Sequence, residues 1–168
     1  MIRQQVKPNG ELASMQKLES AIGIANFHLN LESTKSPEFI DITNQVVDSV
    51  NETGFTMGNV LVYSKHTTAA IKINEMEPLL LEDMERTLEH IASRNADYRH
   101  NDFTIRTVNM NEDECPNGHA HCQHLALGTS ETIPIIDGKL QMGIYQRVFF
   151  IELDHPRQRE VLIQVIGY

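Results

Sequence analysis

The 168-residue sequence contains no tryptophan and only two cysteines, Cys115 and Cys122. Two thiols cannot supply the disulfide framework on which small secreted domains depend. No apolar run approaches about 18 residues, so no segment is long enough to span a membrane as a helix. The first residues also lack the apolar core of a signal peptide. These absences predict a cytoplasmic protein with two free thiols and no membrane segment.

Positive charge is scarce as well. The chain has 14 Lys and Arg residues against 23 Asp and Glu, which gives a formal net charge of −9. Nucleic-acid binding needs clustered cations for the phosphate backbone, so this composition argues against such a partner. A small phosphorylated substrate in a local pocket remains compatible with it. The hydrophobic content of 40% is typical of a globular chain, and the length suits one domain.

Hydrophobic periodicity predicts an α+β fold, a compact single domain with mainly antiparallel sheets and two or three helices. Residues 1–20 are polar and irregular and are interpreted as a loose N-terminal extension to a domain over residues 21–168. Strands are predicted over residues 22–31, 39–42, 59–64, 70–73, 103–108, 132–136, 140–153 and 160–166.

Two helices have clear end signals. Thr43 is a predicted N-cap, and Gly54 suits the end of that helix. Pro78 is predicted to begin a second helix, whose apolar stripe includes Leu81 and Leu88. A hairpin turn is predicted at residues 137–138, which read Asp-Gly.

Residues 114–128, ECPNGHAHCQHLALG, place His119, His121 and His124 within six positions. Imidazole is the commonest metal ligand and is well suited to proton transfer near neutral pH, although solvated histidines in a polar loop would give the same composition. A strand would pair His119 with His121, whereas a helix would pair His121 with His124. Asn117 as N-cap and Gly128 beyond the end favour the helix. Neither conformation brings all three together, so a site needs residues from elsewhere.

A second group of candidates lies where predicted strands end. His66, Thr67 and Thr68 offer an imidazole and two hydroxyls suited to phosphate oxygens, although a strand-edge histidine beside β-favouring threonines would look the same. Asn74 and Glu75 follow at the next strand end, where the carboxylate could ligate a metal, act as a base, or simply complement the dipole of the following helix.

Later segments give weaker signals. Ser130 lies in a Gly-Thr-Ser loop where hydroxyl and backbone donors could meet an anion, or which could be an ordinary turn. Arg147, Arg157 and Arg159 supply cations, and the last two are interpreted as part of a solvated polar turn. In the strand at 140–153, residues 148–151 read Val-Phe-Phe-Ile and have no polar face. Such a strand is predicted to be buried on both sides, by a helix or by another subunit.

Five blocks in order, SKHTTAAIKINE, YRHND, NGHAHCQHLALGTS, IPIIDGKLQMG and FIELDHPRQREVLIQVIG, resemble the YjbQ-like family, called secondary thiamine-phosphate synthases. The resemblance covers residues 39–168. It implies a compact α+β domain assembled as a homotrimer, with the site near a subunit boundary. The family pattern usually reads G-T-W-Q where this chain has Gly-Ile-Tyr-Gln at residues 143–146. Tyr145 keeps an aromatic face and adds a hydroxyl.

The resemblance also implies an activity. The reaction would join a pyrimidine-methyl diphosphate to a thiazole phosphate and release diphosphate, with a divalent metal ion, Zn or Mg, on the leaving group. Metal-assisted hydrolysis and a non-catalytic small-ligand or metal-binding trimer are the alternatives. The expected roles are catalysis by His66, Glu75 and His121, substrate binding by Thr67, Thr68, Asn74, His100, Ser130 and Gln146, and metal ligation by His66, His119 and His121.

Overall fold

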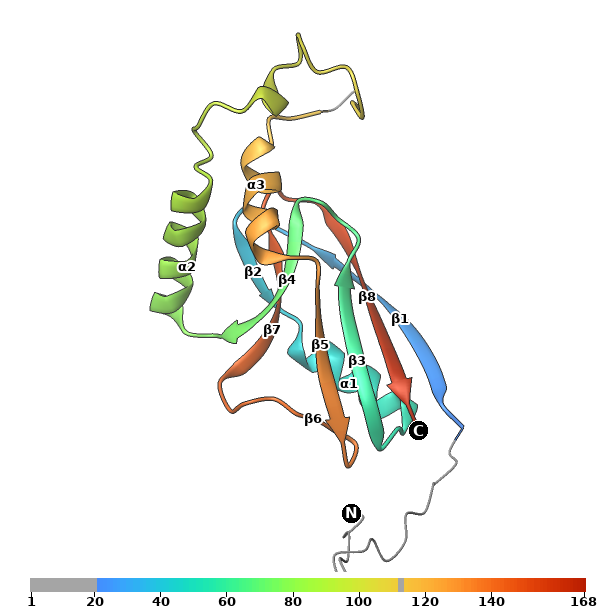
Figure 1. The fold of residues 1–168 in the computed structure, drawn as a ribbon. Coiled ribbons are helices and arrows are strands. Elements are labelled where there is room, and N and C mark those ends of the chain that lie inside the picture. Colours follow the sequence, from blue (N-terminus) through green and yellow to red (C-terminus); the bar gives the residue numbers. More distant parts are fainter. Residues whose placement is uncertain (1–20, 112–113) are drawn as a thin grey trace, which may run out of the picture.

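A computed structural model describes residues 21–111 and 114–168 of the chain. They form three layers: a five-stranded sheet, a three-stranded sheet, and a pair of helices on the outer side of the smaller sheet (Figure 1). This arrangement confirms the predicted α+β class. The predicted N-terminal extension, residues 1–20, lies outside the described residues.

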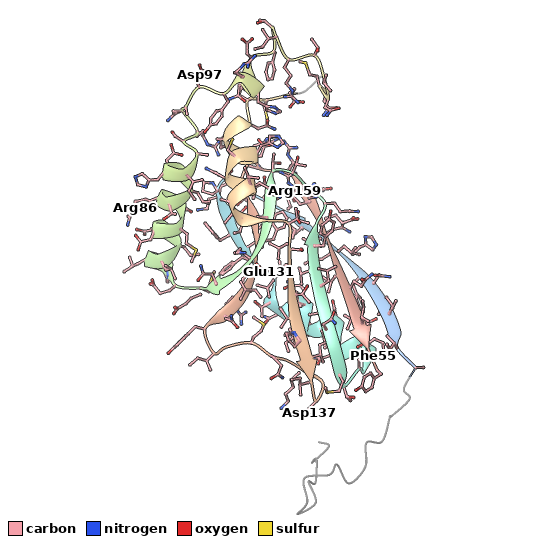
Figure 2. All side chains as sticks on the ribbon, viewed as in Figure 1. Phe55, Arg86, Asp97, Glu131, Asp137 and Arg159 are labelled. Carbon is pink, nitrogen blue, oxygen red and sulfur yellow. The ribbon has the colours of Figure 1, made fainter. Side chains whose placement is uncertain are left out.

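The larger sheet is antiparallel throughout and has the strand order β1-β8-β3-β5-β6. Its strands are β1 (Gly23–Glu32), β3 (Met57–Ser64), β5 (Ser130–Ile136), β6 (Lys139–Leu140) and β8 (Gln158–Gly167). Residues alternate in burial along β1 and β8, as expected for a sheet with one face on the core and one towards solvent. Asp137 lies at the β5–β6 turn, at the opposite end of this sheet from Arg159 (Figure 2).

The smaller sheet, ordered β2-β7-β4, is also antiparallel. It consists of β2 (Glu38–Asp41), β4 (Ala69–Glu75) and the central β7 (Gln146–Glu152). The helices are α1 (Thr43–Thr53), α2 (Pro78–Ile91), the short 3-10 helix η1 (Arg99–Asn101) and α3 (Gly118–Leu127). No helix among the described residues is long and apolar enough to cross a membrane.

Two apolar clusters hold the layers together. The larger lies between the two sheets and α1 and includes Phe150 of β7. The smaller lies between the outer face of the three-stranded sheet and the helices α2 and α3, and includes Phe149 of β7 and Leu88 of α2. Both phenylalanines are fully buried. The predicted burial of β7 on both sides is therefore confirmed, and elements of the same chain cover both of its faces.

The helix predictions agree closely with the structure. Helix α2 begins at Pro78, and the preceding Glu77 side chain accepts hydrogen bonds from the backbone N–H groups of Leu79 (3.0 Å) and Leu80 (2.8 Å). Helix α1 ends at Gly54, which has the left-handed conformation. Its first helical residue is Thr43, so the helix begins one position earlier than predicted and Ile42 is the N-cap. The histidine-rich stretch forms α3, with Gly128 just past its end, as the helical alternative required.

Two strand predictions are wrong. Residues 103–108 form turns, because the Asp102 carboxylate accepts hydrogen bonds from the Thr104 N–H (3.0 Å) and hydroxyl (2.6 Å) and fixes a local turn there. The long strand predicted over 140–153 is divided, because a turn closed by the Gln146 N–H and the Gly143 carbonyl (3.0 Å) separates β6 from β7.

The strand directions bring three connecting segments to one end of the molecule. The β3–β4 loop, residues 65–68, and the β7–β8 loop, residues 153–157, each cross from one sheet to the other. They lie at the same end because the end of β3 pairs with the start of β8, and the start of β4 pairs with the end of β7. The segment that leads into α3 approaches the same region (Figure 1). The candidate site is formed where these three segments meet.

Candidate functional site

The three segments enclose a polar cavity of about 320 Å³. The β3–β4 loop contributes Lys65, His66, Thr67 and Thr68 to its lining, and α3 contributes His121. Residues Cys115 and Asn117 before α3, together with Asp154, Arg157 and Arg159, complete much of the remaining wall. Four of the residues predicted for one site line this single cavity: His66, Thr67, Thr68 and His121.

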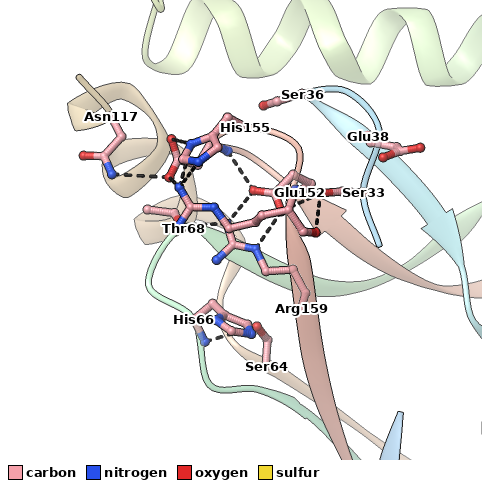
Figure 3. A network of polar contacts seen from close by, with 12 residues as sticks. Ser33, Ser36, Glu38, Ser64, His66, Thr68, Asn117, Glu152, His155 and Arg159 are labelled. Carbon is pink, nitrogen blue, oxygen red and sulfur yellow. Dashed lines mark hydrogen bonds and ion pairs between the residues drawn. The ribbon is translucent and has the colours of Figure 1, made fainter. Parts of the chain in front are cut away.

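A buried ion pair supports the floor of the cavity (Figure 3). Arg159 donates two hydrogen bonds to the Glu152 carboxylate, at 2.7 and 2.6 Å, and a third to the Thr68 hydroxyl at 3.1 Å. Ser33 donates its hydroxyl hydrogen to Glu152 at 3.1 Å. Glu152 is fully buried and Arg159 is 5% exposed, so the interpretation of Arg159 as part of a solvated turn is wrong. The pair fixes the conformation of the loop that carries His66 and Thr67.

The ring of His66 has a defined hydrogen-bonding state. Its Nε2 accepts a hydrogen bond from the backbone N–H of Glu160 at 3.2 Å. A backbone N–H only donates, so Nε2 carries no proton and the neutral ring holds its hydrogen on Nδ1. Burial lowers the pKa of His66, and the neighbouring Arg159 lowers it further. His66 is therefore a neutral donor through Nδ1, and its Nε2 is already occupied.

The helix α3 separates its histidines. His121 lines the cavity and contacts the edge of the His100 ring, with ring centroids 4.7 Å apart. His119 is 3% exposed and is absent from the cavity wall, and its Nε2 has no hydrogen-bond partner among the described residues. Burial lowers the pKa of both His119 and His121. The three predicted metal ligands, His66, His119 and His121, do not form a close ligand group in the described part of the chain.

The group whose geometry suits a metal ion is another one, made by Cys115, Asp154 and His155. One ligand atom from each residue lies within 4.8 Å of the other two. Asp154 is buried, whereas Cys115 and His155 are half-buried. Cys115 and Cys122 are both free thiols.

Three predicted site residues lie far from this cavity within one chain. Asn74 and Glu75 end β4, and the register pairs Glu75 with Gln146 of β7. Because β4 rises about 3.3 Å per residue, Glu75 lies roughly 20 Å from Ala69 beside the cavity. The three residues line a separate hollow with Tyr145. The expectation that Glu75 shares a cleft with His66 and His121 therefore does not hold within a single subunit.

The remaining prediction, Ser130, also lies outside the cavity wall. It is the first residue of β5 and pairs with Tyr63 in the antiparallel register, with an exposed side chain. The roles assigned to the individual residues stay predictions, since geometry alone assigns a place and not a function.

A family model described as UPF0047 protein YjbQ-like matches residues 27–168 of the chain. The chain belongs to the UPF0047, YjbQ-like family. The UPF0047 protein of Methanothermobacter thermautotrophicus is 37% identical to it over 139 residues, which make up 83% of this chain and 90% of that protein. The UPF0047 protein YugU of Bacillus subtilis is 33% identical over 140 residues, covering 83% and 97% of the two chains.

Solved structures of similar proteins share the fold. A YbjQ-like protein of unknown function from Sulfolobus solfataricus aligns with a TM-score of 0.79 at 30% identity and covers 88% of this chain and all of its own. A hypothetical protein from Aeropyrum pernix aligns with a TM-score of 0.76 at 29% identity, covering 86% and 99% of the two chains. The three-layer α+β arrangement is thus the architecture of the UPF0047 relatives.

Sequence reasoning missed the chemistry of residues 152–159. Asp154 and His155 fall in the polar turn predicted between the last two strands, and the sequence predicted no site role for them. The sequence features that could have indicated this group are the adjacent Asp154 and His155, together with Cys115 in the histidine-rich stretch. Only the strand register shows that these segments, almost 40 residues apart, meet at one end of the sheets.

Proposed function

We propose that this UPF0047 protein is a metal-dependent enzyme that binds a small phosphorylated substrate in the cavity at residues 65–68. The observation that carries the proposal is the set of cationic side chains on the cavity wall. The wall contains Lys65, Arg106, Arg157 and Arg159, and each of them is paired with a carboxylate, those of Glu160, Glu114, Asp154 and Glu152 in that order. The side chains of Lys65 and Arg157 are 50% and 38% exposed, so both can turn from these carboxylates to an anionic ligand.

The reaction we propose is that of the secondary thiamine-phosphate synthases. The thiazole nitrogen forms a new C–N bond to the pyrimidine methylene carbon as the C–O bond to the diphosphate breaks. The departing diphosphate gains negative charge, so preformed donors aimed at it lower the barrier. A divalent metal, when bound, would neutralise part of that charge.

The cavity offers donors suited to this task. The neutral His66 presents its Nδ1–H, since Nε2 is already engaged by Glu160. The Thr67 hydroxyl lies beside it, and His121 occupies the opposite segment of the wall. Arg159 holds Thr68 in place through a hydrogen bond to its hydroxyl. We assign His66, Thr67 and His121 to the phosphate groups and Arg159 to positioning of the loop.

The position of Glu75 is compatible with a shared site. If Asn74, Glu75 and Gln146 act with His66 and His121, they must come from another subunit, because β4 separates them within one chain. The hollow at Glu75 carries Ile144 and Tyr145, which are 89% and 65% exposed. Exposed apolar side chains at the rim of a polar site are typical of a subunit contact. We therefore propose a homotrimer in which each site draws residues from two chains.

The direct test is an assay of the purified protein with the pyrimidine-methyl diphosphate and the thiazole phosphate. Formation of thiamine phosphate that falls at least about tenfold in His121→Ala would support the proposal, since losing one donor to a charged group costs about 1.5–3 kcal/mol. The control is His90→Ala, which removes an exposed histidine on α2.

Other outcomes assign other functions. Release of phosphate without the coupled product would identify a metal-assisted hydrolase acting at the same cavity. Binding of both substrates without any turnover would make the protein a small-ligand binding trimer. Unaltered activity in His121→Ala would place the reaction elsewhere in the molecule.

A further inference from the structure

Three different ligand atoms converge beside the cavity at Cys115, Asp154 and His155. The Cys115 Sγ lies 3.3 Å from the His155 Nδ1 and 3.7 Å from the Asp154 Oδ1. The His155 Nδ1 lies 3.0 Å from the same Asp154 oxygen. The three atoms therefore form a compact triangle of sulfur, nitrogen and oxygen.

The dimensions of this triangle match one face of a tetrahedral zinc site. Zinc bonds of about 2.3 Å to sulfur and roughly 2.0–2.2 Å to nitrogen and oxygen place the ligand atoms about 3.4–3.6 Å apart. Each observed separation, 3.3, 3.7 and 3.0 Å, agrees with that range within a few tenths of an ångström. We propose that Cys115, Asp154 and His155 bind a zinc ion, with the fourth position open to the cavity.

The surroundings of Asp154 prepare it to be a ligand. Its Oδ2 accepts hydrogen bonds from the Asn117 amide (3.3 Å) and from Arg157 (2.9 Å), while Oδ1 faces the thiol and the imidazole. Outer hydrogen bonds of this kind orient a carboxylate that coordinates through its other oxygen. Asp154 is 2% exposed, so its direction is fixed by the protein.

Hydrogen bonding alone does not account for the crowding at His155. Its Nδ1 has both the Cys115 sulfur and the Asp154 Oδ1 within 3.3 Å. One imidazole nitrogen has either a hydrogen or a lone pair, and it can satisfy only one such partner well. A cation within the triangle gives the sulfur, nitrogen and oxygen a common partner.

A cysteine nucleophile activated by a His-Asp pair is the competing explanation, and the geometry opposes it. In that arrangement the carboxylate and the nucleophile engage different nitrogens of the imidazole. Here both Asp154 and Cys115 approach Nδ1. The same ring nitrogen cannot be oriented by the carboxylate and take a proton from the thiol.

The ligand set selects the metal. A thiolate is a soft ligand that favours zinc, whereas Mg²⁺ prefers oxygen ligands and keeps several waters. Three protein ligands with an open fourth position are the usual form of a catalytic zinc site. Cys115 and Asp154 line the same cavity as His66 and His121. The catalytic meaning of the zinc rests on the proposed function, but zinc binding is measured without any substrate.

The experiment uses the full chain without a polyhistidine tag, dialysed against metal-free buffer and analysed by inductively coupled plasma mass spectrometry. We expect about one zinc per chain in the wild type. After exchange with Co²⁺, a thiolate-to-cobalt charge-transfer band in the near ultraviolet should appear. Cys115→Ser should lose that band and the retained zinc, whereas Cys122→Ser, which alters the exposed thiol, should keep both.

Asp154→Asn and His155→Gln should each weaken zinc binding by more than about tenfold in competition with a chromogenic chelator. Circular dichroism establishes whether each variant is folded. If Asp154→Asn does not fold, the zinc content of Cys115→Ser tests the proposal. A wild type without retained zinc and without a thiolate–cobalt band would overturn the proposal, as would a Cys115→Ser variant equal to the wild type. Bound zinc without thiamine-phosphate formation would reject only the proposed reaction.

Discussion

At the residue scale, the Glu152–Arg159 pair has the largest energetic consequence. Both side chains are almost completely removed from water, at 0% and 4% exposure. Two charges in such a place are tolerated only because the hydrogen bonds between them, and those from Ser33 and to Thr68, satisfy their polar atoms. The pair connects β7, β8 and the loop that carries His66.

The substitution Glu152→Gln should therefore destabilise the protein by about 3–5 kcal/mol, because it leaves the Arg159 charge buried without its partner. Urea denaturation followed by circular dichroism measures the free energy of unfolding. The matched control is Glu131→Gln, which breaks a half-exposed pair with Lys72 and should cost only about 0–1 kcal/mol. Equal costs for the two substitutions would show that the buried pair has no special role.

At the scale of the elements, α3 was predictable and its surroundings were not. Asn117 and Gly128 bracket the helix in the sequence, and the histidine spacing indicated that no regular element gathers all three rings. The sequence could not show that α3 lies against the smaller sheet, because Ala120 meets Leu88, Phe149 and Leu153 only after folding.

The failed strand at 103–108 illustrates the same limit. Phe103 and Ile105 alternate with polar residues, as in a half-buried strand, but they are 38% and 53% exposed. Among residues 21–111 and 114–168 no strand pairs with this segment, and the Asp102 side chain satisfies the backbone locally. A pattern of period two predicts a strand only when the fold provides a partner.

The histidines on α3 make the stability of the folded protein depend on pH. Burial lowers the pKa of His119, His121 and His124, so the folded chain keeps these rings neutral while the unfolded chain binds protons near the ordinary value of 6.5. Stability is complete above that value and is lost as the pH falls through it, because the unfolded state then binds more protons. The free energy of unfolding should decrease between about pH 7.5 and about pH 5.

Urea denaturation of zinc-free protein at several pH values measures this dependence. His119→Gln should reduce the slope because it removes the most deeply buried of the three rings. His90→Gln, on the exposed side of α2, should leave the slope unchanged. A slope that does not respond to His119→Gln would show that other groups, such as the carboxylates, control the pH dependence.

At the scale of the whole molecule, the site could be predicted only in part. Residues 65–68 and His121 lie in one cavity as the sequence motifs suggested, since loops at strand ends carry most functional side chains. The acidic and thiol groups at Cys115 and Asp154 could not be added, because they meet only when the segment before α3 folds against the β7–β8 loop. The sequence also could not show that Glu75 lies at the far end of β4 from the cavity, because this depends on the direction in which the strand runs.

The homotrimer remains a prediction. The burial of β7 no longer calls for another subunit, because α2, α3 and the larger sheet of the same chain cover it. The separation of Glu75 from His66 is now the stronger reason to expect a shared site. Light scattering should give about three times the chain mass of 19.1 kDa.

Mixed trimers test the sharing itself. His66→Ala and Glu75→Ala chains should each be inactive alone and should recover part of the activity when refolded together, because some sites then receive both intact residues from different subunits. Refolding two batches of His66→Ala is the control and should recover nothing. A monomer mass near 19.1 kDa, or mixtures that stay inactive, would confine each site to one chain.

The measurement that tests the cavity most directly is a calorimetric titration with inorganic diphosphate, performed on the wild type, His66→Ala, His121→Ala and the control His90→Ala. Diphosphate should bind the wild type and the control equally, and each cavity variant should bind at least about tenfold more weakly, because each loses a hydrogen bond to a charged group. If the wild type does not bind diphosphate, or if His66→Ala and His121→Ala bind it as the wild type does, then the cavity between residues 65–68 and α3 is not the anion-binding site.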